Sequence, residues 1–151
     1  MALTKINARD LIVQVESSTP GTWLGISGLN SGTFNPSESE EETDTTEFES
    51  AGEAEQEIMQ RGASVKLEGF KKLDNITGGP DLGQDRCELL ATKKAAESLG
   101  SIRFRHPLNT TWKVWPQATF SAGEQGGGNN DKTSWSMTIK KSGQSTTAAV
   151  A

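Results

Sequence analysis

The chain has 151 residues, of which 32% are hydrophobic, and a net charge of −5, which fits one domain with a single core. It holds no apolar run long enough to span a membrane, and its first residues, MALTKINARD, lack the apolar segment of a secretory signal, so neither a membrane helix nor export is expected. Its one cysteine, Cys87, excludes an internal disulfide and a multi-cysteine metal site, and agrees with synthesis in a reducing cytoplasm.

The charge is divided unevenly along the chain. Residues 1–60 contain twelve acidic and two basic residues, whereas residues 61–151 contain eight acidic and thirteen basic residues. The net charges of the two parts are therefore −10 and +5. This asymmetry is either an accident in a monomer or a means by which copies attract one another when they stack head to tail.

The first part of the chain alternates apolar and polar residues with a period of two, which predicts β-strands. A short polar arm, residues 1–8, precedes a strand over residues 9–16 and an extended run over residues 22–34. A further strand is predicted over residues 63–73, where valine and leucine alternate with lysine and glutamate.

A long acidic stretch, residues 34–62, separates these strands. Residues 38–57 hold ten of the twenty carboxylates of the chain and no lysine or arginine. Residues 41–48 are nevertheless rich in threonine and end on an aromatic residue, which favours a strand over a disordered linker. The stretch is either an idle solvated loop or an arm that faces a partner. For the arm, we expect residues 40–48 to be extended and residues 51–61 to be mobile until a neighbour holds them.

The strongest helix signal lies over residues 81–99. Asp81 is placed to cap this helix, Gln84 occupies the capping-box position, and Gly100 follows the last turn. A helix with one apolar side is predicted to pack on the flank of a sheet. Its apolar stripe is expected to contain Leu82, Leu89 and Ala96, which are spaced by seven residues.

The C-terminal part is predicted to form three more strands, over residues 101–106, 111–120 and 132–141. Pro116 indicates an edge position or a bulge, because proline cannot donate a hydrogen bond to a neighbouring strand. Trp115 and Trp112 have opposite parity, so both faces of their strand need cover, by the helix or by a neighbouring subunit. Residues 142–151 form a small-residue tail that is expected to be mobile unless a neighbour holds it.

The order of these elements predicts a mainly β fold. Strands, one helix and then strands are typical of an antiparallel β-sandwich or barrel with a flanking helix, whereas a parallel sheet would need several helices. We therefore predict one domain over residues 1–151, with the acidic loop or hairpin arm inserted over residues 34–62.

The residues that could carry chemistry stand in no catalytic pattern. His106, the one histidine, has no nucleophile motif around it, and Cys87 lies inside the predicted helix, where a buried structural thiol is expected. Residues 126–128, three glycines, lack the lysine and hydroxyl residue of a phosphate loop. No enzymatic activity, cofactor or metal site is expected, and the scattered basic residues do not favour specific nucleic-acid binding.

The sequence resembles the major tail proteins, or tail tube proteins, of long-tailed bacteriophages. The resemblance rests on WLGISG at residues 23–28, the acidic EEETDTT at residues 40–46, and the strand SWSMTI at residues 134–139. It also rests on the order and size of the elements between them, including the single helix, and it extends over nearly the whole chain.

The resemblance implies a virion structural protein of the phage tail that assembles in the host cytoplasm. Such proteins form six-membered rings that stack into a hollow tube through which the phage DNA passes without specific binding. It further implies contacts with copies of the chain and with the tape measure, terminator and tail tip proteins. One alternative is the inner tube subunit of a contractile tail or injection machine. An alternative of another class is a stand-alone carbohydrate-binding module that uses Trp115.

On this hypothesis, the acidic arm contacts neighbouring subunits or rings. A strand that is polar on both faces gains little from its own core and is held by a neighbour. Negative charge in the lumen would repel DNA phosphates, and the candidates for that role are Glu40, Glu42 and Asp44. Alternatively, the carboxylates of residues 38–57 meet basic residues of the next ring. The predicted contact residues are Glu38, Glu40, Glu41, Glu42, Asp44, Glu47, Phe48 and Trp115.

Overall fold

The computed structural model describes residues 2–38 and 40–150 and has a mainly β architecture. One α-helix, α1, and ten strands account for most of the regular structure, with three short 3-10 turns. The strands are β1 Ile12–Glu16, β2 Trp23–Gly25, β3 Leu29–Asn35, β4 Glu41–Asp44, β5 Gln56–Gln60, β6 Ser64–Phe70, β7 Gly100–Arg105, β8 Thr111–Ala122, β9 Ser134–Lys141 and β10 Thr146–Ala149; α1 is Leu82–Ala91, and the 3-10 turns are η1 Ala8–Asp10, η2 Phe48–Ser50 and η3 Ala95–Ser98.

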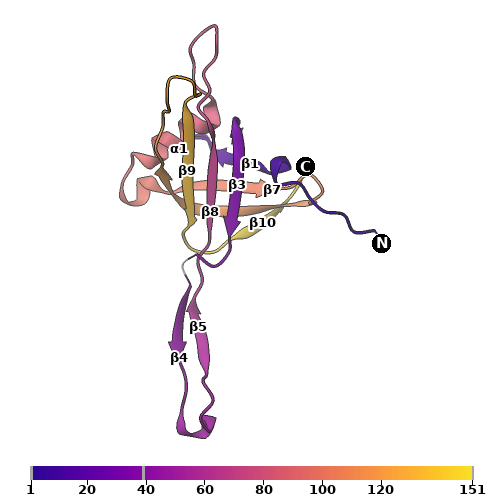
Figure 1. Cartoon of the computed structure of the whole chain (residues 1–151), viewed down its shortest axis with the longest axis vertical. Helices are drawn as coiled ribbons and strands as arrows, with labels where there is room; N and C mark the ends of the chain where they lie inside the picture. Colours follow the sequence, from indigo (N-terminus) through magenta and orange to yellow (C-terminus); the bar gives the residue numbers. More distant parts are fainter. Residues whose placement is uncertain (1, 39, 151) are drawn as a thin grey trace.

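Eight strands form one antiparallel sheet in the order β2-β1-β7-β8-β9-β6-β3, and β10 pairs with β8. The long strand β8 joins two parts of this sheet, because its first residues pair with β7 and β10 and its last residues pair with β9. Figure 1 shows β9 and β3 along the long axis of the molecule and β7 and β10 across it. The sheet thus folds over itself into a sandwich and does not close into a barrel, which confirms the predicted mainly β sandwich with one flanking helix.

Apolar side chains of alternating residues fill the space between the two layers. Val65 and Leu67 of β6 stand opposite Ile139 and Met137 of β9, and all four are buried. Phe34 of β3 lies against Phe104 of β7, with ring centroids 5.4 Å apart, although these strands are not neighbours in the sheet. The aromatic contact therefore connects one layer with the other.

The bulge predicted at Pro116 is present, although β8 is not an edge strand. Trp115 pairs with Ile102 and Ala118 pairs with Gly100, so two residues of β8 oppose one of β7. On its other side, β8 pairs with β10 up to Val114 and with β9 from Ala118. Pro116 lies between these two ladders, where the lack of an N–H costs no strand pairing.

The helix differs from its prediction in length and in its buried face. It ends at Ala91, and the predicted remainder forms a turn and then η3. Leu82 and Leu89 of the predicted stripe are 64% and 45% exposed, and Ala96 is exposed as well. The residues that α1 buries are instead Gly83, Gln84, Cys87 and Leu90.

The C-terminal tail is not free, contrary to prediction. Thr146–Ala149 form β10, which pairs with Thr111–Val114 of β8. The first part of β8 has no other partner on this side, so its backbone groups are available for the tail. The expectation that this tail is mobile unless a neighbour holds it is therefore wrong for residues 146–149, which pair within the chain.

Candidate assembly surfaces

The acidic stretch forms a two-stranded arm that projects from the sandwich. Strands β4 and β5 pair only with each other, with Glu42 opposite Ile58 and Asp44 opposite Gln56. Figure 1 shows this arm extending from one end of the long axis, away from the body. Every residue of both strands is exposed. An isolated two-stranded ribbon is marginally stable in water, so this arm needs a partner surface.

The predicted mobile segment is also part of this arm. Residues 56–60 of the segment form β5, because the preceding turn brings them back alongside β4. The hairpin arm is thus present, and the prediction that residues 51–61 are mobile until a neighbour holds them is wrong for residues 56–60.

The tip of the arm has a defined shape with an apolar residue at its apex. The 3-10 turn Phe48–Ser50 carries a capping box between Glu47 and Ser50, and Ala51 follows in the left-handed region with φ 54°. Below it, the Thr46 hydroxyl accepts from the Glu55 N–H at 2.9 Å. Phe48 is fully exposed. These local contacts present one aromatic ring outward between two glutamates.

The carboxylate of Asp44 is stabilised in its ionised form. Hydrogen bonds from the side chain and the backbone N–H of Thr46 hold the pKa of Asp44 below its ordinary value of 3.8. Asp44 is therefore ionised at neutral pH.

The predicted contact residues fall into three groups. Glu41, Glu42, Asp44, Glu47 and Phe48 lie together on the arm and are exposed.

Glu38 and Glu40 lie at the root of the arm. Glu40 forms an ion pair with Arg61 at 2.9 Å, and Glu38 accepts from the Asn35 amide at 2.7 Å. The ion pair between Arg61 and Glu40 thus joins the two sides of the hairpin at its base. Of the lumen candidates, Glu40 already has a partner within the chain, whereas Glu42 and Asp44 face solvent.

Trp115 forms the third group, and the prediction that it contacts a neighbouring subunit is wrong. It is 1% exposed and lies in the core, where its ring contacts Phe34 at 6.0 Å and Phe104 edge-on at 5.3 Å. Trp112, on the other face of β8, is covered by the guanidinium groups of Arg103 and Arg105. A buried ring cannot contact a neighbouring chain or stack on a sugar, so the carbohydrate-binding alternative loses its residue.

Two exposed apolar segments were missed by the sequence reasoning. The loop between β6 and α1 exposes Leu73 and Ile76, and Figure 1 shows it at the opposite end of the long axis from the arm. The N-terminal segment exposes Leu3 and Ile6. In the sequence, these residues appear as isolated apolar residues in segments that are otherwise polar or rich in turns. Isolated apolar residues are too common on protein surfaces to indicate a binding site.

A groove opens between the two layers of the sandwich. It has a volume of about 440 Å³, and its apolar wall includes Phe34, Phe104 and Trp112. Arg105 and Lys113 line it as well, with the Lys113 Nζ 4.7 Å from the centre of the Phe34 ring. Arg105 Nε and His106 Nδ1 are buried here and have no hydrogen-bond partner among the residues that the structure describes.

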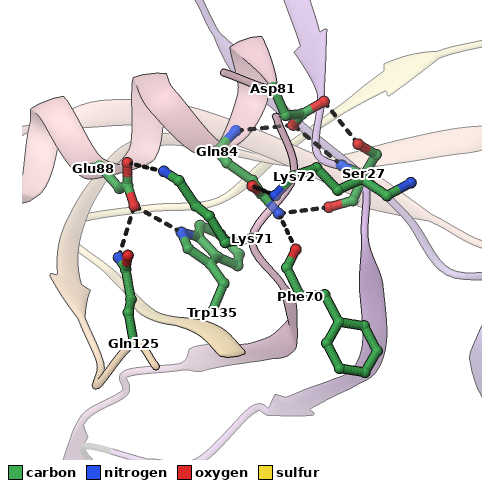
Figure 2. A network of polar contacts seen from close by, with 9 residues as sticks. All are labelled: Ser27, Phe70, Lys71, Lys72, Asp81, Gln84, Glu88, Gln125 and Trp135. Carbon is green, nitrogen blue, oxygen red and sulfur yellow. Dashed lines mark hydrogen bonds and ion pairs between the residues drawn. The ribbon is translucent and has the colours of Figure 1, made fainter. Parts of the chain in front are cut away.

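A polar network fixes α1 to the sandwich (Figure 2). Asp81 caps the helix as predicted, because its carboxylate accepts from the Gln84 N–H at 3.1 Å and from the Ser27 hydroxyl at 2.7 Å. The fully buried Gln84 amide donates to the carbonyls of Ser27 and Phe70 at 2.9 and 2.8 Å and accepts from the Lys72 N–H at 3.1 Å. The helix is thereby tied to the loops that follow β2 and β6.

Glu88, one turn after Gln84 on the same side of α1, extends this network along the helix. It accepts from Lys71 at 2.6 Å, from Gln125 at 2.7 Å and from the Trp135 indole at 3.2 Å. Burial raises the pKa of Glu88, but these hydrogen bonds and the charge of Lys71 outweigh it and hold the pKa below its ordinary value of 4.5. The network is structural, because each of its members serves to hold α1.

The Glu88→Gln variant is expected to lose stability at neutral pH and to be less sensitive to acid. The depressed pKa means that ionised Glu88 stabilises the fold above pH 4.5, and that this contribution disappears as the pH falls through the lower folded-state pKa. The loss should be about 1–3 kcal/mol near neutral pH and should shrink as the pH falls below 4.5. Urea unfolding across this pH range tests it, with the exposed Glu97→Gln as control; a constant difference would contradict it.

Cys87 and the groups that could bind a metal ion are the remaining candidates for chemistry. Burial raises the pKa of the Cys87 thiol to about 12, so this cysteine is a structural residue. Within residues 2–38 and 40–150, no three histidine, cysteine or acidic residues lie together as a metal site. Over the same residues, no helix has the length and apolar character that crossing a membrane requires.

Solved structures share this fold over its full length. A chain from the tail of an empty gene transfer agent particle, computed with helical refinement and C6 symmetry, matches with a TM-score of 0.72 and 17% identity, covering 97% of this chain and 100% of that one. A chain from the virion of a native gene transfer agent particle matches with a TM-score of 0.64 and 17% identity, covering 96% and 100%. No family model matches the sequence, and no curated protein does. The chain therefore has the fold of a gene transfer agent tail chain, which confirms at the level of fold the resemblance to phage tail proteins.

Proposed function

We propose that this protein is a tail tube subunit of a phage or phage-like particle and that it acts by self-assembly, without catalysis. In this proposal, six copies form a ring, and the rings stack into a hollow tube that the genome crosses without specific binding. The support is a fold match across the whole chain to a chain from a C6-symmetric tail. The tape measure, terminator and tail tip proteins are the further partners at the ends and in the lumen of such a tube.

The observation that carries the proposal is the projecting arm. Among the residues that the structure describes, no strand of the sandwich pairs with the two strands of the arm, and their residues are exposed on both faces. A stable monomer gains nothing from such a ribbon, because it buries no apolar surface and leaves strand edges unpaired. A subunit that is packed between copies of itself gains a connector that spans from one subunit to another.

The charge distribution supports stacking of the same kind. The arm carries most of the negative charge of residues 1–60, whereas residues 61–151 have a net charge of +5. Contacts between the arm of one copy and the body of the next bring opposite charges together. Carboxylates that remain free in the tube wall, with Glu42 and Asp44 as the candidates, would repel DNA phosphates and let the genome slide.

Electron microscopy of the purified recombinant protein tests the proposal. We expect rings or tubes whose formation depends on protein and salt concentration. Monomers that persist at high concentration and at both low and high salt would refute the tail tube function for this chain.

Reversing the charge of two arm residues is expected to impair stacking. In the Glu41→Lys/Glu42→Lys variant, the arm repels the basic body surface that it meets in the tube, while the monomer stays folded because both side chains are exposed. We expect a clear rise in the concentration needed for tube formation, measured by light scattering and electron microscopy. Glu97→Lys/Glu124→Lys makes the same charge change on the body away from the arm. Equal effects of the two variants would contradict an electrostatic role of the arm.

A further inference from the structure

We infer that the ring of Phe48, at the tip of the arm, inserts into the aromatic groove of another copy of this chain. The groove is the one lined by Phe34, Phe104 and Trp112 between the two layers of the sandwich. The inference rests on the proposed self-assembly and names the residue and the site that make the contact.

The tip has the properties of an anchor. Phe48 is fully exposed at the apex of the arm, and its position is fixed by the capping box of Glu47 and Ser50 and by the left-handed Ala51. A non-glycine residue in the left-handed region carries a small conformational cost, which is kept here to turn the chain sharply behind the ring. Because the backbone of this turn is already ordered, binding would cost mainly the rotation of the Phe48 side chain, and aromatic residues dominate the energy of many interfaces.

The groove has the size and chemistry to receive this ring. Its volume of about 440 Å³ leaves room for one aromatic side chain with its flanking backbone, and its wall contains three aromatic residues. A buried phenylalanine removes on the order of 150–250 Å² of surface from water. Because the arm extends away from its own body (Figure 1), Phe48 of one copy is presented to a groove of another.

The charges around the two surfaces are complementary. Phe48 lies between Glu47 and Glu49 in the sequence. Arg105 and Lys113 line the groove, and no aspartate or glutamate is among its described lining residues. An inserted tip would thus place its two carboxylates beside two cations, in a site where they are partly shielded from water.

The same charges argue against the exposed N-terminal segment as the occupant. This segment presents Leu3 and Ile6, but Lys5 lies between them. Its insertion would bring a third cation next to Arg105 and Lys113, which is unfavourable because like charges repel one another at short range. The acidic tip of the arm therefore fits the charge of the groove better than the N-terminal segment does.

Cysteine trapping tests the contact in assembled material. Glu49→Cys keeps Phe48 in place, and Thr147→Cys puts the second thiol on the groove wall, opposite Lys113 in the pairing of β8 with β10. We expect the double variant to give a ladder of disulfide-linked oligomers after oxidation of tubes. The natural Cys87 is buried and does not compete. The matched control is Glu49→Cys/Ile76→Cys, with an exposed thiol at the opposite end of the body.

A truncation measures the contribution of the ring. We expect Phe48→Ala to raise the concentration needed for assembly by roughly 10- to 30-fold, as for an interface anchor. Met59→Ala, an exposed apolar residue on the same arm, should have little effect.

The outcomes separate the contact from the assembly itself. The inference is supported if tubes of Glu49→Cys/Thr147→Cys give the disulfide-linked ladder and tubes of Glu49→Cys/Ile76→Cys do not. Tubes that form normally but link only through Ile76, or not at all, overturn the contact and leave the tail tube function standing. Chains of the natural sequence that never associate refute the tail tube function, and the contact with it.

Discussion

Replacing residues 41–60 by a short glycine-serine linker is expected to abolish tube formation while the sandwich stays folded. The arm reaches away from the body, so stacked subunits without it lose the proposed connector (Figure 1). None of the replaced residues is buried, so the thermal midpoint of the body should change by no more than a few degrees. Electron microscopy and a thermal melt of the same preparation measure both effects.

Mixing arm-less and natural chains sharpens this experiment. An arm-less chain still offers its groove and body to the arm of a natural chain but cannot extend the contact further. Small amounts are therefore expected to shorten the tubes in proportion to their share of the mixture. Tubes of normal length from arm-less chains alone would show that the arm is dispensable for stacking.

Trp115→Ala is expected to lower the free energy of unfolding by about 3–5 kcal/mol, as for other large core aromatic residues. Trp115 connects Phe34 in one layer of the sandwich with Phe104 in the other, and it is 1% exposed. Its removal leaves a cavity beside Phe34 and Phe104, where the layers meet. Urea denaturation followed by circular dichroism gives the change in free energy.

Phe48→Ala is the matched control for that stability measurement. It truncates another aromatic residue, but one that is fully exposed at the tip of the arm, so its effect on the monomer should stay within about 0.5 kcal/mol. Similar losses in the two variants would contradict the placement of Trp115 in the core. The pair also separates the two roles of aromatic residues here, since Trp115 serves the fold and Phe48 serves the proposed assembly.

The start of the helix could be predicted from neighbouring residues, but its buried face could not. The cap at Asp81 was predictable because it involves a residue three positions away, and the structure has the expected bond from the Gln84 N–H. The side chain of Gln84, however, turns into the core to bond Ser27, 57 residues away in the sequence, and Phe70. Because Gln84 must face the core to make these hydrogen bonds, α1 is oriented with Gly83 and Cys87 buried and Leu82 exposed.

The sequence alone determined the alternating strands, the mainly β class, an irregularity at Pro116 and the extended character of residues 41–44 in the acidic stretch. Each of these follows from interactions between near neighbours: the period of side-chain alternation, the missing N–H of proline, and threonine among the acidic residues. Such features depend on a few consecutive residues, so they can be predicted without knowing which distant residues pack against them.

Only the tertiary structure decided which face of a strand or helix is covered, and by what. Trp115 and Trp112 are both tryptophans of one strand, yet the fold of the sheet places the first in the core and the second under two arginines. The tail became β10 because the start of β8 had free backbone groups. The groove that is proposed to receive Phe48 likewise exists only where the layers meet, because residues far apart in the chain form its wall.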